Sequence, residues 1–216
     1  MKCCIFDLDG TLTDTLDSLT YSTNQTLKEL GMGSITREQC RMFVGNGARN
    51  QISCALRACG DTELVHLEEA MEIYLRIFAE HCTDFVVPYE GIPELLKELK
   101  KNGVKLAVHS NKPHQQAVNV VQTIFGEGVF DLVQGQQDPY PRKPDPYMAE
   151  QIIKRLGSSE EEATYVGDSE VDIHTGQNAG IQTVGVNWGF RGKELLKEAG
   201  AKIMIDRPQE LLHYVL

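Results

Sequence analysis

Short apolar runs alternate with amphipathic segments along most of this chain, and that alternation leaves few folds open. Glycines that follow several of the amphipathic segments suit helix C-terminal caps. Strands that alternate with helices predict βαβ units and a parallel sheet. The expected strands lie at 3–6, 104–108, 130–133, 163–166, 181–184 and 202–205, and the expected helices between them at 92–101, 115–125, 147–156, 171–179 and 192–199.

The stretch from about Asp14 to Val87 departs from this rhythm and is helical throughout. Its predicted helices span 16–30, 37–43, 48–59 and 63–80, and the next strand run is 85–88. We therefore expect an α/β core made of residues 1–14 and 86–216, with an α-helical insertion, residues 15–85, after the first strand.

The charge balance limits the classes of partner. The 216 residues carry 31 acidic and 21 basic side chains, a formal net charge of −10, whereas a nucleic-acid surface needs a clustered basic face. No apolar run approaches the ~18 residues of a membrane span. The acid at position 7 comes too early for a signal peptide. We expect a cytoplasmic protein with no nucleic-acid or membrane partner.

The six cysteines all lie within the first 82 residues, and none form a CxxC pair. A chain of this length has enough core not to need disulfides, and no ligand-spaced histidine accompanies the cysteines. We expect free thiols, mostly buried.

Polar residues follow three of the predicted strands. The first strand ends in Asp7-Leu8-Asp9-Gly10-Thr11, the strand at 104–108 in His109-Ser110-Asn111, and the strand at 163–166 in Gly167-Asp168-Ser169. Ligands of open parallel sheets bind outside the carboxyl ends of the strands. The sequence thus predicts one site built from these three loops.

These motifs resemble those of haloacid dehalogenase superfamily phosphatases, most closely the phosphoglycolate phosphatase branch. The resemblance covers nearly the whole chain and implies a Rossmann-like three-layer core with a mobile helical cap. It implies a phosphatase that acts on a small phosphorylated metabolite. The matching segments are 7–14, 89–92, 110–113, 142–146, 167–172 and 188–191.

Two carboxylates are the predicted catalytic pair. Asp7 would attack phosphorus and form an aspartyl-phosphate, which divides one hard step into two. Asp9, two residues on, would point to the same side of an extended backbone, and the resemblance implies that it protonates the leaving oxygen and then activates water. The alternative is that both are turn or capping acids.

A second acidic pair, Asp168 and Asp172, is spaced i, i+4, which would place both carboxylates on one face of a helix that starts near Ser169. Their mutual repulsion favours a cation partner, and Mg²⁺ prefers carboxylate and phosphate oxygens. By resemblance, Asp7, Asp168 and the Asp9 backbone carbonyl hold Mg²⁺, with Asp172 as a direct or water-mediated support. The alternative is a pair of acids that stabilise a helix N-terminus.

The predicted phosphate-binding residues are Thr11, Ser110 and Asn111. Lys143, between Arg142 and Pro144, would offset charge on the phosphoryl oxygens. The neighbouring Arg142 is a rival that we expect to be solvated. His109 should face away from Ser110 on its strand and pack as a structural histidine.

A loop of the insertion, Gly45-Asn46-Gly47, and Arg49 after it are candidates for contact with the substrate. The loop N–H groups could approach a small acid, and Arg49 could bind a carboxylate with both nitrogens. The alternative is a tight turn between helices with an exposed arginine.

Other activities of this superfamily stay open: pyrophosphatase, nucleotide or sugar-phosphate phosphatase, and, less favoured, a phosphomutase or a catalytically silent regulatory protein. The insertion holds one lysine, Lys28, and no histidine before His66, which disfavours relatives that need a Schiff-base lysine or an early cap histidine. Asp9 disfavours a dehalogenase. We expect a monomer or a homodimer.

Overall fold

A computed structural model describes all 216 residues. Six parallel strands form the main sheet in the order β5-β4-β1-β6-β7-β8. The first of them, β1, is wholly buried, as expected of a central strand in a parallel sheet. The strands are β1 (Cys3–Phe6), β4 (Lys105–Pro113), β5 (Leu132–Gln136), β6 (Ala163–Gly167), β7 (Gln182–Val186) and β8 (Ile203–Ile205).

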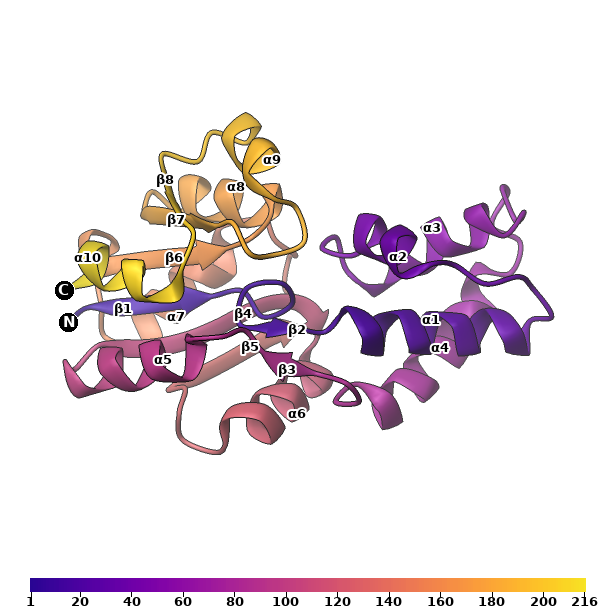
Figure 1. Cartoon of the computed structure of the whole chain (residues 1–216), viewed down its shortest axis with the longest axis horizontal. Helices are drawn as coiled ribbons and strands as arrows, with labels where there is room; N and C mark the ends of the chain where they lie inside the picture. Colours follow the sequence, from indigo (N-terminus) through magenta and orange to yellow (C-terminus); the bar gives the residue numbers. More distant parts are fainter.

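Helices cover both faces of this sheet. Successive side chains of β1 point to opposite faces and are all apolar, so both faces need a covering layer. Cys4 and Phe6 belong to one apolar cluster with α5, α6 and α10, whereas Cys3 and Ile5 belong to a second cluster with α7. This arrangement confirms the three-layer α/β fold (Figure 1). The helices of the core are α5 (Ile92–Lys101), α6 (His114–Phe125), α7 (Tyr147–Arg155), α8 (Glu170–Asn178), α9 (Lys193–Glu198) and α10 (Leu212–Val215).

The helical insertion leaves and re-enters the core through a two-stranded antiparallel ribbon, β2 (Thr13–Asp14) with β3 (Val87–Pro88). Its four helices lie beyond one end of the sheet (Figure 1). They are α1 (Leu16–Glu29), α2 (Arg37–Phe43), α3 (Ala48–Ala58) and α4 (Leu67–His81). The helices stand where the sequence predicts them, and the division into domains at residues 15 and 85 stays a prediction.

Two elements differ from expectation in length. Helix α4 begins at Leu67 rather than near Glu63, because Leu64 adopts a left-handed conformation (φ 58°) and the Asp61 carboxylate accepts the N–H groups of Val65 and His66. Strand β4 runs on to Pro113, with an irregular register against β5 between His109 and Pro113. This irregular stretch carries the polar residues of the second strand end.

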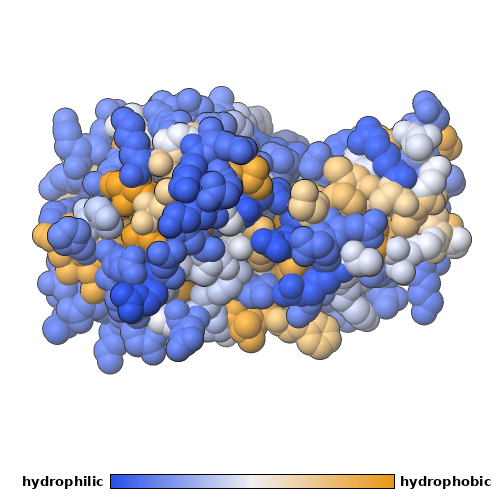
Figure 2. Space-filling model, turned by 45° about the horizontal axis from the view of Figure 1, so that its top comes forward, coloured by the Kyte–Doolittle hydropathy of each residue, from blue (hydrophilic) through white to orange (hydrophobic).

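All six cysteines are free, and Cys3, Cys4, Cys40 and Cys82 are buried, while Cys54 and Cys59 are half-buried. None of the helices combines the length and the apolar character that a membrane span requires. The surface of the core is largely hydrophilic on the face in Figure 2, with a paler apolar area over the helical insertion.

Candidate active site

The carboxyl ends of β1, β4 and β6 lie side by side, since Phe6 of β1 pairs with Val108 on one side and Val166 on the other. The Asp7 N–H continues this pairing by donating to the Val166 carbonyl at 2.9 Å. The predicted convergence of three strand-end loops is therefore what the structure shows. A pocket at this point is lined by residues of the core and of the helical insertion.

Asp7 and Asp172 are held by the same ammonium. The Nζ of Lys143 lies 2.7 Å from Oδ1 of Asp7 and 2.7 Å from Oδ1 of Asp172. The second oxygen of Asp172 accepts the backbone N–H of Ser169 at 3.1 Å and its hydroxyl at 2.6 Å. Asp172 thus fixes Lys143 and caps helix α8 at once.

The expected i, i+4 helical pairing of Asp168 with Asp172 is wrong in detail. Ser169 is the N-cap of α8, so Asp168 lies before the helix and Asp172 is its third residue. The two carboxylates still converge, because the N-cap turn folds the Asp172 side chain back toward Ser169.

Asp168 is enclosed by neutral donors. Thr11 donates its hydroxyl to Oδ1 at 3.2 Å, and the Phe190 N–H donates to Oδ2 at 2.7 Å. Thr11 is fully buried and does not line the pocket, and its hydroxyl helps to position Asp168. Its expected role in phosphate binding stays a prediction.

Two glycines let the backbone close around Asp168. A Cβ on Gly10, which has φ +93°, would lie 2.5 Å from Oδ2 of Asp168. A Cβ on Gly189 would lie 2.2 Å from the Asp168 Cβ and 2.4 Å from the Gly10 carbonyl oxygen. Only residues without side chains fit at both places.

Gly189→Ala should therefore lower the free energy of unfolding by about 1–3 kcal/mol and displace Asp168, as overpacking does elsewhere. Gly33→Ala is the matched control, because only the Cys59 sulfur, at 3.9 Å, lies near its new Cβ. Urea titration of both variants would measure the difference. Equal stability of the two variants would contradict the tight packing described here.

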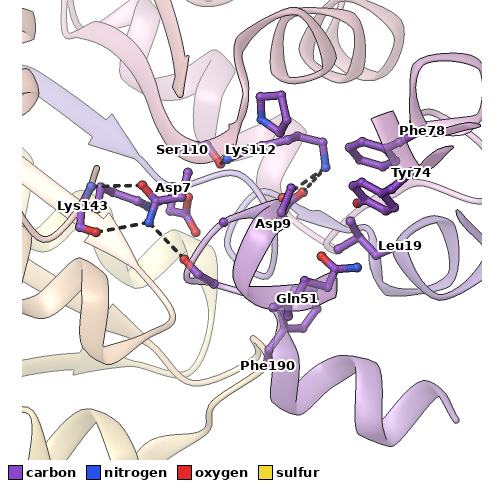
Figure 3. Close-up of a pocket in the computed structure, with 16 residues that line it drawn as sticks. Asp7, Asp9, Leu19, Gln51, Tyr74, Phe78, Ser110, Lys112, Lys143 and Phe190 are labelled. Atoms are coloured by element: carbon purple, nitrogen blue, oxygen red, sulfur yellow. Dashed lines mark hydrogen bonds and ion pairs between the residues drawn. The ribbon is translucent and has the colours of Figure 1, made fainter. Parts of the chain in front are cut away.

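The other aspartate of the predicted pair, Asp9, has a partner that sequence reasoning missed. Lys112 binds both Asp9 oxygens, at 2.9 and 3.1 Å, and lies 4.8 Å from the ring centroid of Phe78 in α4 (Figure 3). Lys112 lies two residues after Ser110 on the same strand, so its side chain points to the same side as that of Ser110, and this spacing could have identified it as a site residue. The resemblance includes Lys112 but assigned it no role.

Ser110 and Asn111 line the pocket, and the Asn111 side chain also forms hydrogen bonds that connect parts of its wall. The Asn111 side chain donates to the carbonyls of Gly45 (3.1 Å) and Lys143 (3.3 Å) and accepts the Lys143 N–H at 3.0 Å. One side chain therefore joins the second strand end to both the lysine loop and the insertion.

The loop of the insertion meets the pocket only in part. Gly45 and Gly47 line it, whereas Asn46 is exposed and is not a pocket residue. Arg49 turns outward to pair with Glu68 of α4 and is likewise outside the pocket. In this structure the guanidinium is paired on the surface, and its contact with a substrate carboxylate stays a prediction.

A clasp of two arginines joins the insertion to the core. Arg41 of α2 donates to the Phe190 carbonyl at 2.6 Å, and Arg191 donates back to the carbonyls of Arg41 (2.8 Å) and Val44 (2.5 Å). Arg191 also pairs with Glu170 at 3.3 Å. The insertion is therefore held over the strand ends.

The alternatives for the neighbouring cation and histidine are resolved by burial. Arg142 is exposed, as predicted, whereas Lys143 is buried. His109 is buried with its Nδ1 3.1 Å from the Tyr165 hydroxyl, and it does not line the pocket. Burial, with Lys143 nearby, lowers the pKa of His109 well below its ordinary value, so it is neutral.

Burial is the main influence on the pKa values of Asp7 and Asp168. It raises the pKa of Asp7 to about 7, against the lowering effect of Lys143, and raises the pKa of Asp168 well above its usual range, with Asp172 and Asp7 adding to the rise. Burial alone would lower the pKa of Lys143, but Asp172 and Asp7 outweigh it and raise that pKa. The single positive charge of Lys143 is thus too little to balance the carboxylates of Asp7, Asp168 and Asp172.

That deficit and the geometry fit a divalent cation. One oxygen from each of Asp7, Asp168 and Asp172 lies within 4.8 Å of the others, and Lys143 neutralises only part of their charge. Oxygen ligands of this kind suit Mg²⁺. Three buried carboxylates, of which Asp7 and Asp172 share one ammonium, can hold such an ion.

Comparison with known proteins agrees with this geometry. Residues 4–186 match the family model described as haloacid dehalogenase-like hydrolase. A phosphoglycolate phosphatase of Aquifex aeolicus is 32% identical over 88% of this chain and 86% of its own, and one of Colwellia psychrerythraea is 32% identical over 96% and 94%. The crystal structure of a candidate phosphoglycolate phosphatase from Lactobacillus delbrueckii subsp. bulgaricus is 32% identical, with a TM-score of 0.89 over 100% of this chain and 99% of that one. With its strand-end aspartates in this setting, the chain belongs to the haloacid dehalogenase-like hydrolase family, as a phosphatase.

Proposed function

We propose that this protein hydrolyses a small phosphomonoester of the 2-phosphoglycolate type, with Mg²⁺ as cofactor and a phosphoaspartate on Asp7 as intermediate. The observation that carries the proposal is the buried Asp7 carboxylate at the end of β1, held by Lys143 within a cluster of acids. Relatives of similar length bear the name phosphoglycolate phosphatase, which supports the substrate class.

The residues of the pocket divide the reaction between them. An Asp7 oxygen attacks phosphorus while the bond to the leaving oxygen breaks, and Asp9 gives that oxygen a proton. Asp9 then takes a proton from water, whose oxygen attacks the phosphorus and releases phosphate from Asp7. Lys143, Ser110 and the Asn111 N–H hold the phosphoryl oxygens throughout.

Mg²⁺ would be held by Asp7, Asp168 and the Asp9 backbone carbonyl. When bound, it offsets negative charge on the phosphoryl oxygens. Asp172 is occupied by Lys143 and Ser169, so we propose that it supports the ion through these neighbours. Asp168 depends in turn on Thr11 and the Phe190 N–H.

The pocket sets a limit on the rest of the substrate. It holds about 450 Å³ of space, part of it open to solvent, and α1, α3 and α4 contribute Leu19, Gln51, Tyr74 and Phe78 to its wall. The enclosed part that a ligand could fill is only about 40 Å³, well below the volume of a typical ligand site, so a compact leaving group fits best.

Phosphate release from a panel of phosphorylated metabolites would test the proposal. We expect the highest kcat/KM for 2-phosphoglycolate, ahead of nucleoside monophosphates and hexose phosphates. A protein that released phosphate from none of these compounds in the presence of Mg²⁺ would contradict it.

Removal of Mg²⁺ should reduce phosphate release by at least about 100-fold, since a bound cation contributes several kcal/mol of charge stabilisation. The measurement is the rate after exhaustive chelation and after Mg²⁺ is added back. Activity that survives chelation unchanged would refute the role of the ion, whereas recovery on addition shows that the fold was intact.

A further inference from the structure

Lys112 is a buried cation that the proposed chemistry leaves without a task. Its side chain is 1% exposed, and its ammonium lies against both oxygens of Asp9 and over the ring of Phe78. An ammonium has three N–H donors, and Asp9 is the only protein acceptor within hydrogen-bonding distance. At least one donor is therefore available to a ligand in the pocket.

The position of Lys112 divides the pocket into two ends. Lys143 and Asp7 form one end, where the phosphoryl group would lie, and Lys112 stands on the far side of Asp9, beside Tyr74 and Phe78 (Figure 3). Because Asp9 would protonate the leaving oxygen, the group attached to that oxygen extends toward Lys112.

Lys112 is the cation that lines the pocket at that end, whereas Arg142 is exposed and lies outside the pocket, behind Gly47. Lys112 and Lys143 are the only basic residues that line the pocket, while Arg49 pairs with Glu68 and Arg191 with Glu170. An anionic leaving group without a cation would be repelled by Asp7 and Asp9. The ring face of Phe78 would keep the ammonium stabilised as it turns from Asp9 toward a ligand.

We propose that Lys112 binds a second anionic group of the substrate, next to the leaving oxygen. It thereby selects phosphate esters whose leaving group carries a carboxylate or a further phosphate. This inference rests on the proposed function and names the residue that sets its specificity.

The test compares substrates that differ in this charge. We expect wild-type protein to prefer 2-phosphoglycolate, and pyrophosphate if a second phosphate serves, over ethyl phosphate, which is similar in size and has a neutral leaving group. Lys112→Met should lower the ratio of the two kcat/KM values, anionic over neutral, by about 10- to 100-fold, the range of a hydrogen bond to a charged group. Lys112→Arg, which keeps the charge, should retain most of the ratio.

The ratio separates specificity from a role in holding Asp9. If Lys112→Met slowed both kinds of substrate equally, Lys112 would act only through Asp9 and the proposal would be overturned. If wild type hydrolysed no ester, the proposed function would fail, but calorimetric binding of phosphonoacetate against ethylphosphonate would still decide the role of Lys112. A preference for phosphonoacetate that Lys112→Met abolishes supports the proposal, and one that survives overturns it.

Discussion

Asp7→Asn should reduce phosphate release by at least about 10⁴-fold, because an amide is not a nucleophile toward phosphorus and the covalent route closes. Asp9→Asn should cost less, about 10²- to 10⁴-fold, the usual contribution of a general acid and base. Glu127→Gln, an exposed carboxylate far from the pocket, should stay within about twofold of wild type.

A labelled substrate distinguishes the roles of the two aspartates. With an aryl phosphate, whose leaving group needs little protonation, Asp9→Asn should still transfer label to the protein, since Asp7 remains able to attack. Asp7→Asn should carry none after an acid quench. Label that persisted in Asp7→Asn would place the nucleophile elsewhere.

The stability of Asp7→Asn should match or exceed that of wild type. Burial raises the pKa of Asp7, so its charged form is disfavoured in the folded protein, and a neutral amide of the same shape relieves that cost. Lys143 keeps Asp172 as a partner. A thermal unfolding curve would therefore separate loss of chemistry from loss of fold.

The fold could be predicted because its signals are local. Each strand and helix predicted from Ile92 onward lies within a few residues of the observed element, because apolar periodicity and glycine caps are signals that span only a few residues. Helix α4 begins late because the left-handed Leu64 and the Asp61 turn override the helical pattern before it. Short elements such as β2 and α10 depend on tertiary partners and gave no pattern of their own.

The site could be predicted only as far as strand ends determine it. Asp7, Lys143 and Asp168 follow from their motifs, and the structure brings them together. The contact of Lys112 with Asp9 spans 103 positions, and the pairing of Arg49 with Glu68 depends on how α3 packs against α4. Such contacts follow from side-chain directions in the folded protein.

The contacts that Arg41 and Arg191 make between insertion and core likewise depend on side-chain directions in the folded protein. Both guanidinium groups bind backbone carbonyls across the boundary between insertion and core, and no sequence pattern reveals such contacts. These contacts hold the insertion against the core, where Gly45 and Gly47 form part of the pocket wall.

Lys143→Met should affect both activity and stability strongly. The ammonium is the only cation in contact with Asp7 and Asp172, so its loss leaves two buried carboxylates without a counter-charge. Breaking a buried pair in this way costs about 3–5 kcal/mol of stability. Loss of one electrostatic donor from the phosphoryl site should lower kcat by about 10²- to 10³-fold. Arg142→Met, in the same loop but exposed, is the matched control and should change neither quantity by more than a small factor.

Magnesium should partly reverse the loss of stability, and it gives the prediction its sharpest readout. Without Lys143, the carboxylates of Asp7, Asp168 and Asp172 carry more uncompensated negative charge. The free energy of binding a divalent cation there should therefore be more favourable than in wild type. We expect Mg²⁺ to raise the Tm of Lys143→Met by more than it raises that of wild type or Arg142→Met. An equal rise in all three proteins would mean that the ion binds away from these acids. Recovery of Tm without recovery of kcat would show that the lysine acts on the phosphoryl group itself, because the cation can replace its charge among the acids but not its N–H donors.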